Sequence, residues 1–312
     1  MPFINALPGA VAQGLVWAVM AIGVYITFRI LDIADLTVDG SFATGGAVMA
    51  IYAMNSDGST GSMIVGMLLA LAAGLVAGLI TGLIHTRLGI PPILSGILTQ
   101  LILWSVNLKI MSGRANISLS ARQYDVIVKL SDPLASILVI LGIVAFIIVV
   151  LYLFFGTELG SAIRATGNNL KMSRAQGINV NLNKVIGLML SNGLVALSGA
   201  LLSQYQGFAD INMGRGAIVI GLAAVVIGEA VFSKIVKNFA LRLASVAFGA
   251  VVYFIVYQLV ISLGMDTDLM KMLSAIVVAI FLGIPYLKKK YIDPAVKAKK
   301  EAKNSSGGDE NA

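Results

Sequence analysis

Residues 135–155 read ASILVILGIVAFIIVVLYLFF, a stretch without a single charged side chain. An α-helix needs about 20 mainly apolar residues to cross the hydrocarbon core of a bilayer, so this stretch predicts a membrane-spanning helix. Backbone amides in hydrocarbon must be paired within their own segment, and the period-two alternation typical of strands is absent. Stretches of the same kind occur at 9–30, 62–86, 184–206, 241–263 and 270–287, and shorter or interrupted ones at 41–54, 93–111 and 217–232. The sequence therefore predicts an all-α, polytopic integral membrane protein with about eight to ten transmembrane helices, some of them broken or short.

The composition excludes several other classes of protein. Hydrophobic residues make up 58% of the 312 residues and charged residues only 12%, about half the charged share that is usual in soluble domains. The 33 glycines suit the close helix approach found in membranes. Because the chain has no cysteine and only one histidine, His85, disulfides, thiolate metal sites and multi-histidine zinc sites are excluded, and we expect no metal.

Two regions differ in character along the chain. Residues 1–287 are expected to form a single transmembrane domain that includes a polar segment at 156–183. Residues 288–312 begin with lysines and end in the polar run NSSGGDENA, which is typical of a disordered tail beside a membrane rather than of a nucleic-acid-binding arm. The N-terminus carries no Lys or Arg before the first apolar run, so we expect a retained span rather than a cleaved signal peptide.

The basic residues predict an orientation. Segments 156–183 and 233–242 and the tail after 288 all carry Lys or Arg, which are enriched in cytoplasmic loops. These three regions and the C-terminus are therefore expected in the cytoplasm. The N-terminus would lie outside with nine crossings, or inside if residues 31–54 form two half-elements.

The polar segment 156–183 is expected to form two short helices. Asn169 is suited to cap the start of the second helix, and Gly177 to end it in the left-handed conformation. Ile163, Leu170 and Met172 are expected to pack against the bundle, while Arg164 and Arg174 face outward. The alternative is an ordinary ordered cytoplasmic loop.

Polar residues within spans are costly and often functional. Those that could line a pathway are Asp39, Ser41, Thr44, Thr99, Gln100, Asn107 and Asn192. For each of them the alternative is a hydrogen bond between helices, and Asp39 could instead be the N-cap of the second helix. Arg29, Asp32 and Asp35 are expected to form an ion-pair cluster at a membrane edge.

Several motifs resemble one family of transport proteins. They are Gly160-x-Ala162-x-Arg164-Ala165, Asn168-Asn169, Ala175-x-Gly177-Ile178-Asn179, and the stretches LTVDGSFATGGAV (36–48), NGLVALSGALL (192–202) and GAIVIGLAAVVIG (216–228). Together they resemble the permease subunits of bacterial ABC importers of the branched-chain amino acid and ribose type, over roughly residues 8–287. The wording of 36–48 is similar to a subgroup paired with binding proteins for tryptophan or other aromatic amino acids.

The resemblance implies a fold, partners and roles. The fold would be that of the type II ABC importers, with a cytoplasmic coupling helix, in the bacterial cytoplasmic membrane. The partners would be a cytoplasmic ATPase that hydrolyses ATP with Mg²⁺, a second permease copy in a homodimer, and an external solute-binding lipoprotein; the chain itself would bind no cofactor. Contact with the ATPase would involve Gly160, Ala162, Arg164, Ala165, Asn168, Asn169, Arg174 and Gly177.

Two other functions are less compatible with the sequence. A self-contained transporter driven by protons or sodium would need an acid buried in the membrane, and the candidates, Asp39 and Glu229, lie near span ends. A membrane-embedded enzyme would need paired carboxylates or a histidine cluster, and no phosphate-binding G-x-x-x-x-G-K-[ST] loop occurs. We therefore expect a transport subunit without catalytic residues.

Overall fold

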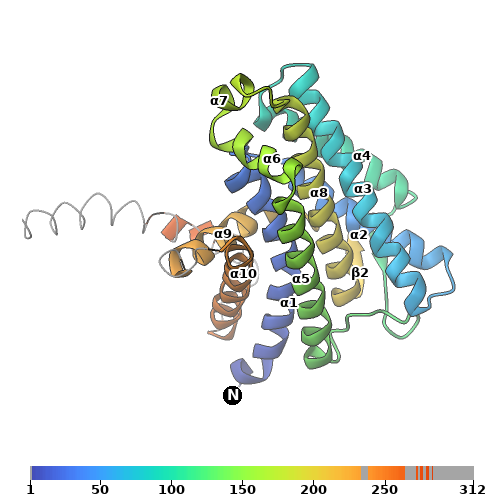
Figure 1. Ribbon diagram of the computed structural model, residues 1–312. Coiled ribbons are helices and arrows are strands. Elements are labelled where there is room, and N and C mark those ends of the chain that lie inside the picture. Colours follow the sequence, from blue (N-terminus) through green and yellow to red (C-terminus); the bar gives the residue numbers. More distant parts are fainter. Residues whose placement is uncertain are drawn as a thin grey trace, which may run out of the picture.

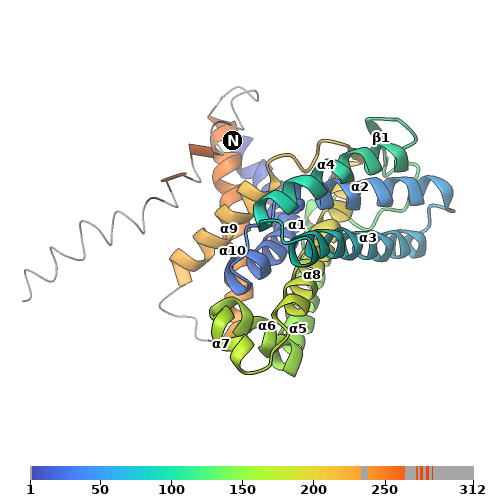
Figure 2. The same ribbon diagram turned by 90° about the horizontal axis from the view of Figure 1, so that it is seen from above.

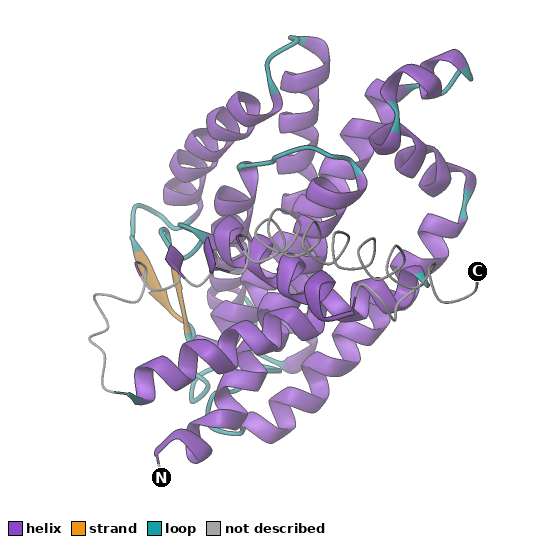
Figure 3. Cartoon of the chain, turned by 90° about the vertical axis from the view of Figure 1, so that its left-hand side faces the viewer, coloured by secondary structure: helices purple, strands orange, loops and turns teal. Residues whose placement is uncertain are grey.

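The computed structural model describes residues 2–232 and 238–263, together with the single positions 272, 275, 276, 279, 280 and 283. Helices make up most of the described chain, and a short ribbon is its one patch of strand (Figure 3). The span expected at 270–287 and the tail at 288–312 lie outside the described residues, apart from those single positions.

The elements follow the expected spans closely. In chain order they are α1 (Pro2–Tyr25), the π-helix η1 (Ile26–Ile30), α2 (Thr37–Asn55), α3 (Thr60–Arg87), α4 (Pro92–Ile110), β1 (Asn116–Ser118), α5 (Pro133–Gly156), α6 (Glu158–Asn168), α7 (Leu170–Ala175), α8 (Val180–Gln206), β2 (Phe208–Asp210), α9 (Ala217–Phe232) and α10 (Phe239–Ser262). Within the part of the chain that the structure describes, six helices are long and apolar enough to cross a membrane: α1 with η1, α3, α4, α5, α8 and α10. The all-α, polytopic membrane class is confirmed.

Two elements of the bundle depart from a full apolar span. α2 has 19 residues, but it is not among the helices that satisfy both the length and the hydropathy of a span. α9 is apolar but has only 16 residues. They correspond to two of the three shorter or interrupted spans that the sequence predicts, and the third, at 93–111, is instead long and apolar enough to cross a membrane as α4. α2 and α9 meet at the site described below.

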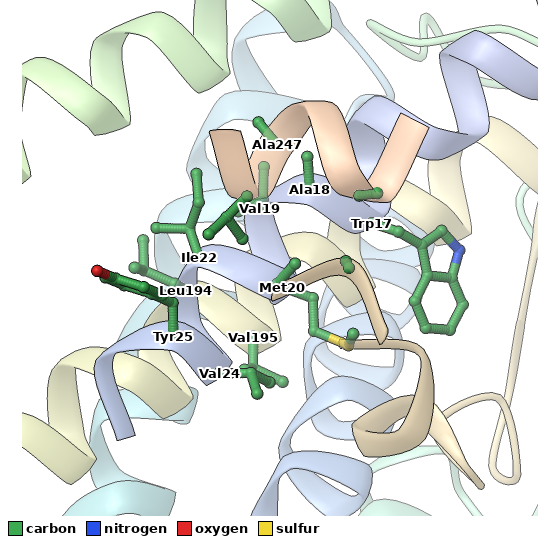
Figure 4. Close-up of a cluster of buried hydrophobic side chains, with 14 of the residues drawn as sticks. Trp17, Ala18, Val19, Met20, Ile22, Val24, Tyr25, Leu194, Val195 and Ala247 are labelled. Carbon is green, nitrogen blue, oxygen red and sulfur yellow. The ribbon is translucent and has the colours of Figure 1, made fainter. Parts of the chain in front are cut away.

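α1 and α8 form the centre of the bundle. In both, 83% of the most apolar window is buried, against 28% in α4 and 22% in α5. Figure 4 shows side chains of α1 meeting Leu194 and Val195 of α8 and Ala247 of α10. From above, α3 and α4 lie on one side of α8, and α9 and α10 lie on the other side of α1 (Figure 2).

A glycine stripe lets α3 approach α8. A Cβ atom added to Gly74, Gly78 or Gly82 would come within 2.3 to 2.9 Å of the α8 backbone at Asn192, Leu188 and Val185. Small residues at such crossings allow close backbone contact in membranes. This glycine stripe therefore packs within one chain.

The two ends of the bundle are distinct. α6 and α7 lie at one end, and the N-terminal end of α1 lies at the other (Figure 1). α1 therefore ends, through η1, beside α6. β1 pairs antiparallel with β2, with Ile117 opposite Ala209, and this ribbon was not predicted.

Candidate functional site

α9 begins inside the bundle, where Asp39 of α2 caps it. The Asp39 carboxylate accepts hydrogen bonds from the backbone amides of Gly216 at 2.9 Å and Ile218 at 3.0 Å. The N-cap position of α2 is Leu36, which makes no side-chain cap. Asp39 is therefore not the N-cap of its own helix; it satisfies the free amides of a helix that is distant in sequence.

A cavity of about 150 Å³ lies beside this contact. Its lining comes from α2, α4 and the segment before α9: Asp39, Gly40, Ala43, Gln100, Leu101, Trp104, Asn107, Ile211 and Arg215. At about 1.5 Å per residue, Gln100 and Asn107 lie roughly 12 and 22 Å along α4 from Pro92, in a helix roughly 28 Å long. The cavity therefore lies within the thickness of the bundle.

The cavity contains polar groups that lack partners. Asn107 is fully buried, and neither its amide nitrogen nor its carbonyl oxygen has a hydrogen-bond partner in the described chain. Three of the predicted pathway residues, Asp39, Gln100 and Asn107, line this cavity. Trp104 and Arg215 were not predicted; Trp104 lies within α4 and Arg215 just before α9, and no sequence signal marked either as part of a pathway.

Two other predicted pathway residues belong to a buried network. Ser41 donates to the Asn192 carboxamide oxygen at 2.6 Å, and the Asn192 amide donates to Asp35 at 2.7 Å. The second Asp35 oxygen accepts from the Thr37 amide at 2.9 Å. Every member of this network has a partner, so it joins α2 to α8 as the interhelical alternative requires.

The expected cluster of Arg29, Asp32 and Asp35 is wrong. Asp35 is buried and bonded as described, while Arg29 pairs with Glu229 of α9 at 2.8 Å. The prediction grouped charges that are close in sequence. The chain leaves η1 in an extended segment, which carries Asp35 away from Arg29 and into the bundle.

Thr44 and Thr99 bond within their own helices. The Thr44 hydroxyl donates to the Gly40 carbonyl at 2.9 Å, and the Thr99 hydroxyl donates to the Ser95 carbonyl at 3.0 Å. Both side chains are buried, and neither lines the cavity.

The segment between α5 and α8 forms the two capped helices that the sequence predicts. Thr157 caps α6 by accepting from the Gly160 amide at 3.3 Å. The Asn169 side chain caps α7 by accepting from the amides of Lys171 and Met172 at 3.1 and 3.0 Å. Gly177 then adopts a left-handed φ of +77°, which favours glycine.

The faces of these helices were predicted only in part. Ile163 is buried, but Leu170 and Met172 are 42% and 57% exposed, because the short α7 turns Ser173 toward the bundle instead. Arg174 is exposed as expected. Arg164 is also exposed as expected, although its guanidinium donates to the Phe155 carbonyl at 2.7 Å and lies 5.9 Å from the centre of the Phe239 ring.

The other residues that were predicted to contact the ATPase differ in their exposure. Gly160 is buried against the end of α5, Ala162 and Ala165 are half-buried, and Asn168 is exposed. Gly167, which was not predicted, brings α6 directly onto η1, since an added Cβ would lie 1.8 Å from the Ile30 carbonyl oxygen. Within the described residues, no group of three His, Cys, Asp or Glu side chains could hold a metal ion.

Comparisons with known proteins agree with this architecture. The family model for the permease component of the branched-chain amino acid transport system matches residues 7–282. A tyrosine transport system permease protein of Clostridioides difficile is 36% identical over 279 residues, which cover 89% of this chain and 91% of that protein. An uncharacterized protein of Rickettsia prowazekii is 34% identical over 292 residues, covering 89% of this chain and 97% of that one. A xylose transport system permease protein of Haemophilus influenzae is 35% identical over 80 residues, or 26% of this chain and 21% of that protein.

Proposed function

The chain belongs to the family of branched-chain amino acid transport system permeases, and from this premise we propose that it forms the membrane pathway for import of an aromatic amino acid. It is the permease component of an ABC-type transport system, and the ATPase is a different subunit. Membership of this family implies an ATPase partner and a solute-binding protein. The aromatic substrate is part of the proposal, supported by the tyrosine transport permease to which the chain is similar.

The main support for this proposed function is a cavity with polar lining residues in an otherwise apolar helix bundle. Asp39, Gln100 and Asn107 line it between two helices, α2 and α4. An unpaired carboxamide such as that of Asn107 costs about 2–7 kcal/mol when it is transferred from water to an apolar medium. Such a group is tolerated where polar solute and water pass, which is the property that a permease requires.

The α6–α7 segment is the proposed contact with the ATPase. Two caps and a left-handed glycine fix its shape, and Gly167 seats it on η1. Its surface carries exposed apolar side chains at Leu159, Leu170 and Met172, and Leu182 in the first turn of α8 is exposed as well. Exposed apolar groups gathered on a polar segment mark a surface for a protein partner, and the predicted orientation places that surface in the cytoplasm.

A second copy of the chain is the proposed partner within the membrane. Leu101 is 63% exposed and Trp104 is 43% exposed, and both line the cavity as well as the outer face of α4. The wall of the cavity formed by Leu101 and Trp104 therefore also belongs to the surface of α4, and a partner that packs on α4 would close the cavity there. A homodimer that pairs these faces would enclose the pathway.

Uptake by reconstituted transporter tests the proposal. Vesicles that hold the chain with its ATPase, with ATP inside and binding protein outside, should accumulate radiolabelled L-tyrosine. Uptake by the chain alone, driven by a proton or sodium gradient, would overturn the proposal in favour of a self-contained transporter.

A pair of matched variants tests the docking surface. Met172→Glu should reduce co-purification of the ATPase, because it places a charge in the apolar contact, without lowering the thermal unfolding midpoint of the permease. Leu130→Glu makes the same kind of change at a 60% exposed leucine in the segment between β1 and α5, and should leave co-purification intact. Equal ATPase loss in both variants would contradict the assignment.

A further inference from the structure

We infer that the cavity between α2, α4 and the segment before α9 recognises the zwitterionic end of an amino acid, with Asp39 facing the ammonium group and Arg215 the carboxylate. This inference rests on the proposed function, because it names the contacts made at the same cavity. It adds which chemical groups of the solute are read and by which side chains.

Two opposite charges line one small space. Asp39 and Arg215 both border the cavity, and no hydrogen bond or ion pair joins their side chains. The Asp39 carboxylate accepts from backbone amides at the start of α9, and a carboxylate offers about four acceptor positions. Each residue therefore retains capacity for a charged group of the solute.

The position of Asp39 determines which charged end of the solute faces which side of the cavity. A free helix N-terminus would attract a carboxylate, but here Asp39 already accepts from the amides of Gly216 and Ile218. A second carboxylate at that place would face the negative charge of Asp39. The cation that lines the cavity is Arg215, so the solute carboxylate belongs on that side and its ammonium group on the side of Asp39.

Asn107 supplies an independent sign of a polar ligand. Its amide nitrogen and carbonyl oxygen are both buried without a partner, and the residue lines the cavity. A carboxamide both donates and accepts, so it can bond a carboxylate oxygen and an ammonium hydrogen alike. Gln100 brings a second carboxamide to the same wall.

The size of the cavity fits one end of the solute. Its volume of about 150 Å³ is below the range of roughly 300–1,000 Å³ for pockets that enclose drug-sized ligands. The charged end of an amino acid is therefore enclosed, and its side chain extends past Trp104. That indole is 43% exposed and offers an aromatic side chain a flat apolar surface.

The chain supplies its own reporter for a test. It contains two tryptophans: Trp17, which packs in the core against Phe42, and Trp104 in the cavity. Purified permease in lipid nanodiscs, carrying Trp17→Phe, would report on Trp104 alone, with excitation at the red edge where tyrosine does not absorb. The unsubstituted chain serves as a second measurement, and Trp104→Phe should lose the signal.

The ligands are chosen to remove one charge at a time. L-Tyrosine should change the fluorescence saturably. Tyramine, which lacks the carboxylate, and 3-(4-hydroxyphenyl)propionate, which lacks the ammonium group, should each bind at least about tenfold more weakly, as the loss of a charged hydrogen bond predicts.

Two variants assign each charge to a residue. Arg215→Gln should weaken L-tyrosine to the affinity of tyramine and leave tyramine unchanged. Asp39→Asn keeps an acceptor for the α9 amides and should remove the preference for L-tyrosine over the propionate. Arg122→Gln, at an exposed arginine outside the cavity, is the control and should change neither.

The outcomes separate this inference from the proposed function. Equal binding of all three ligands, an unchanged affinity in Arg215→Gln, or no saturable signal with any amino acid would overturn the zwitterion site and leave the import function standing. Binding of L-leucine in place of L-tyrosine, with the same effects of both variants, would overturn the aromatic substrate and support the zwitterion site.

Discussion

Two pairs of aspartate and asparagine lie in this bundle, and they differ in one respect. Asp35 and Asn192 bond each other and their neighbours Thr37 and Ser41, so that both side chains are satisfied. Asp39, only four residues further along the chain, shares a cavity with Asn107, whose carboxamide has no partner in the described residues. The same residue types thus hold helices together where they pair and form a candidate site where they do not.

Replacing each asparagine by leucine should give the largest difference in stability between the two pairs. Asn192→Leu leaves one Asp35 carboxylate oxygen and the Ser41 hydroxyl without a partner in the interior, which should cost about 3 kcal/mol or more. Asn107→Leu breaks no bond, so its free energy of unfolding should be unchanged or higher while amino acid uptake is lost. Thermal unfolding in detergent and uptake in vesicles measure both; an equal destabilisation would mean that Asn107 has a structural role.

Double-mutant cycles should sharpen the contrast. Asp35→Ala with Asn192→Ala should show a coupling energy of about 1–3 kcal/mol, because the side chains are in direct contact. Asp39→Ala with Arg215→Ala should show less than about 0.5 kcal/mol, because no bond joins them in the absence of solute. Unfolding in a mixed-detergent titration gives the four free energies of each cycle, and coupling in the second pair would indicate an ion pair.

The cap on α9 should give a smaller effect. Asp39→Ala removes the acceptor for the Gly216 and Ile218 amides and should cost about 1 kcal/mol of stability. Asp39→Asn keeps an acceptor and should stay near the unsubstituted chain in thermal unfolding. Transport should fall in both variants, since both lose the negative charge in the cavity. If Asp39→Asn transported normally, the cap alone would explain this residue.

The threonines should show the smallest effect. Thr44→Val and Thr99→Val remove hydroxyls that bond only their own helices, so unfolding free energies should change by no more than about 0.5 kcal/mol. Uptake should be retained. A large loss of uptake with normal stability would place either hydroxyl in the pathway.

The fold could be predicted because its signals are local. A run such as 135–155 can only be a spanning helix in lipid, and Asn169 and Gly177 end their helices through bonds to near neighbours. The site was predicted only in part, because its contacts join distant segments. Asp39 bonds residues 177 and 179 positions away, and no local pattern of residues indicates that Asp35 turns inward to Asn192 of α8. Leu170 and Met172 were misplaced because hydropathy alone does not show which face of a one-turn helix docks.

The contact of Gly167 with Ile30 has a mechanical consequence. No side chain separates the backbones of Gly167 and Ile30. Close-packed contacts of this kind have low compressibility and transmit strain. Any rotation of α6 must therefore displace the π-helical turn at the end of the central helix. From Ile30 the chain continues directly to Asp35 and Asp39. A displacement of α6 would therefore first shift Asp35, which bonds Asn192 of α8, and then Asp39, which lines the cavity.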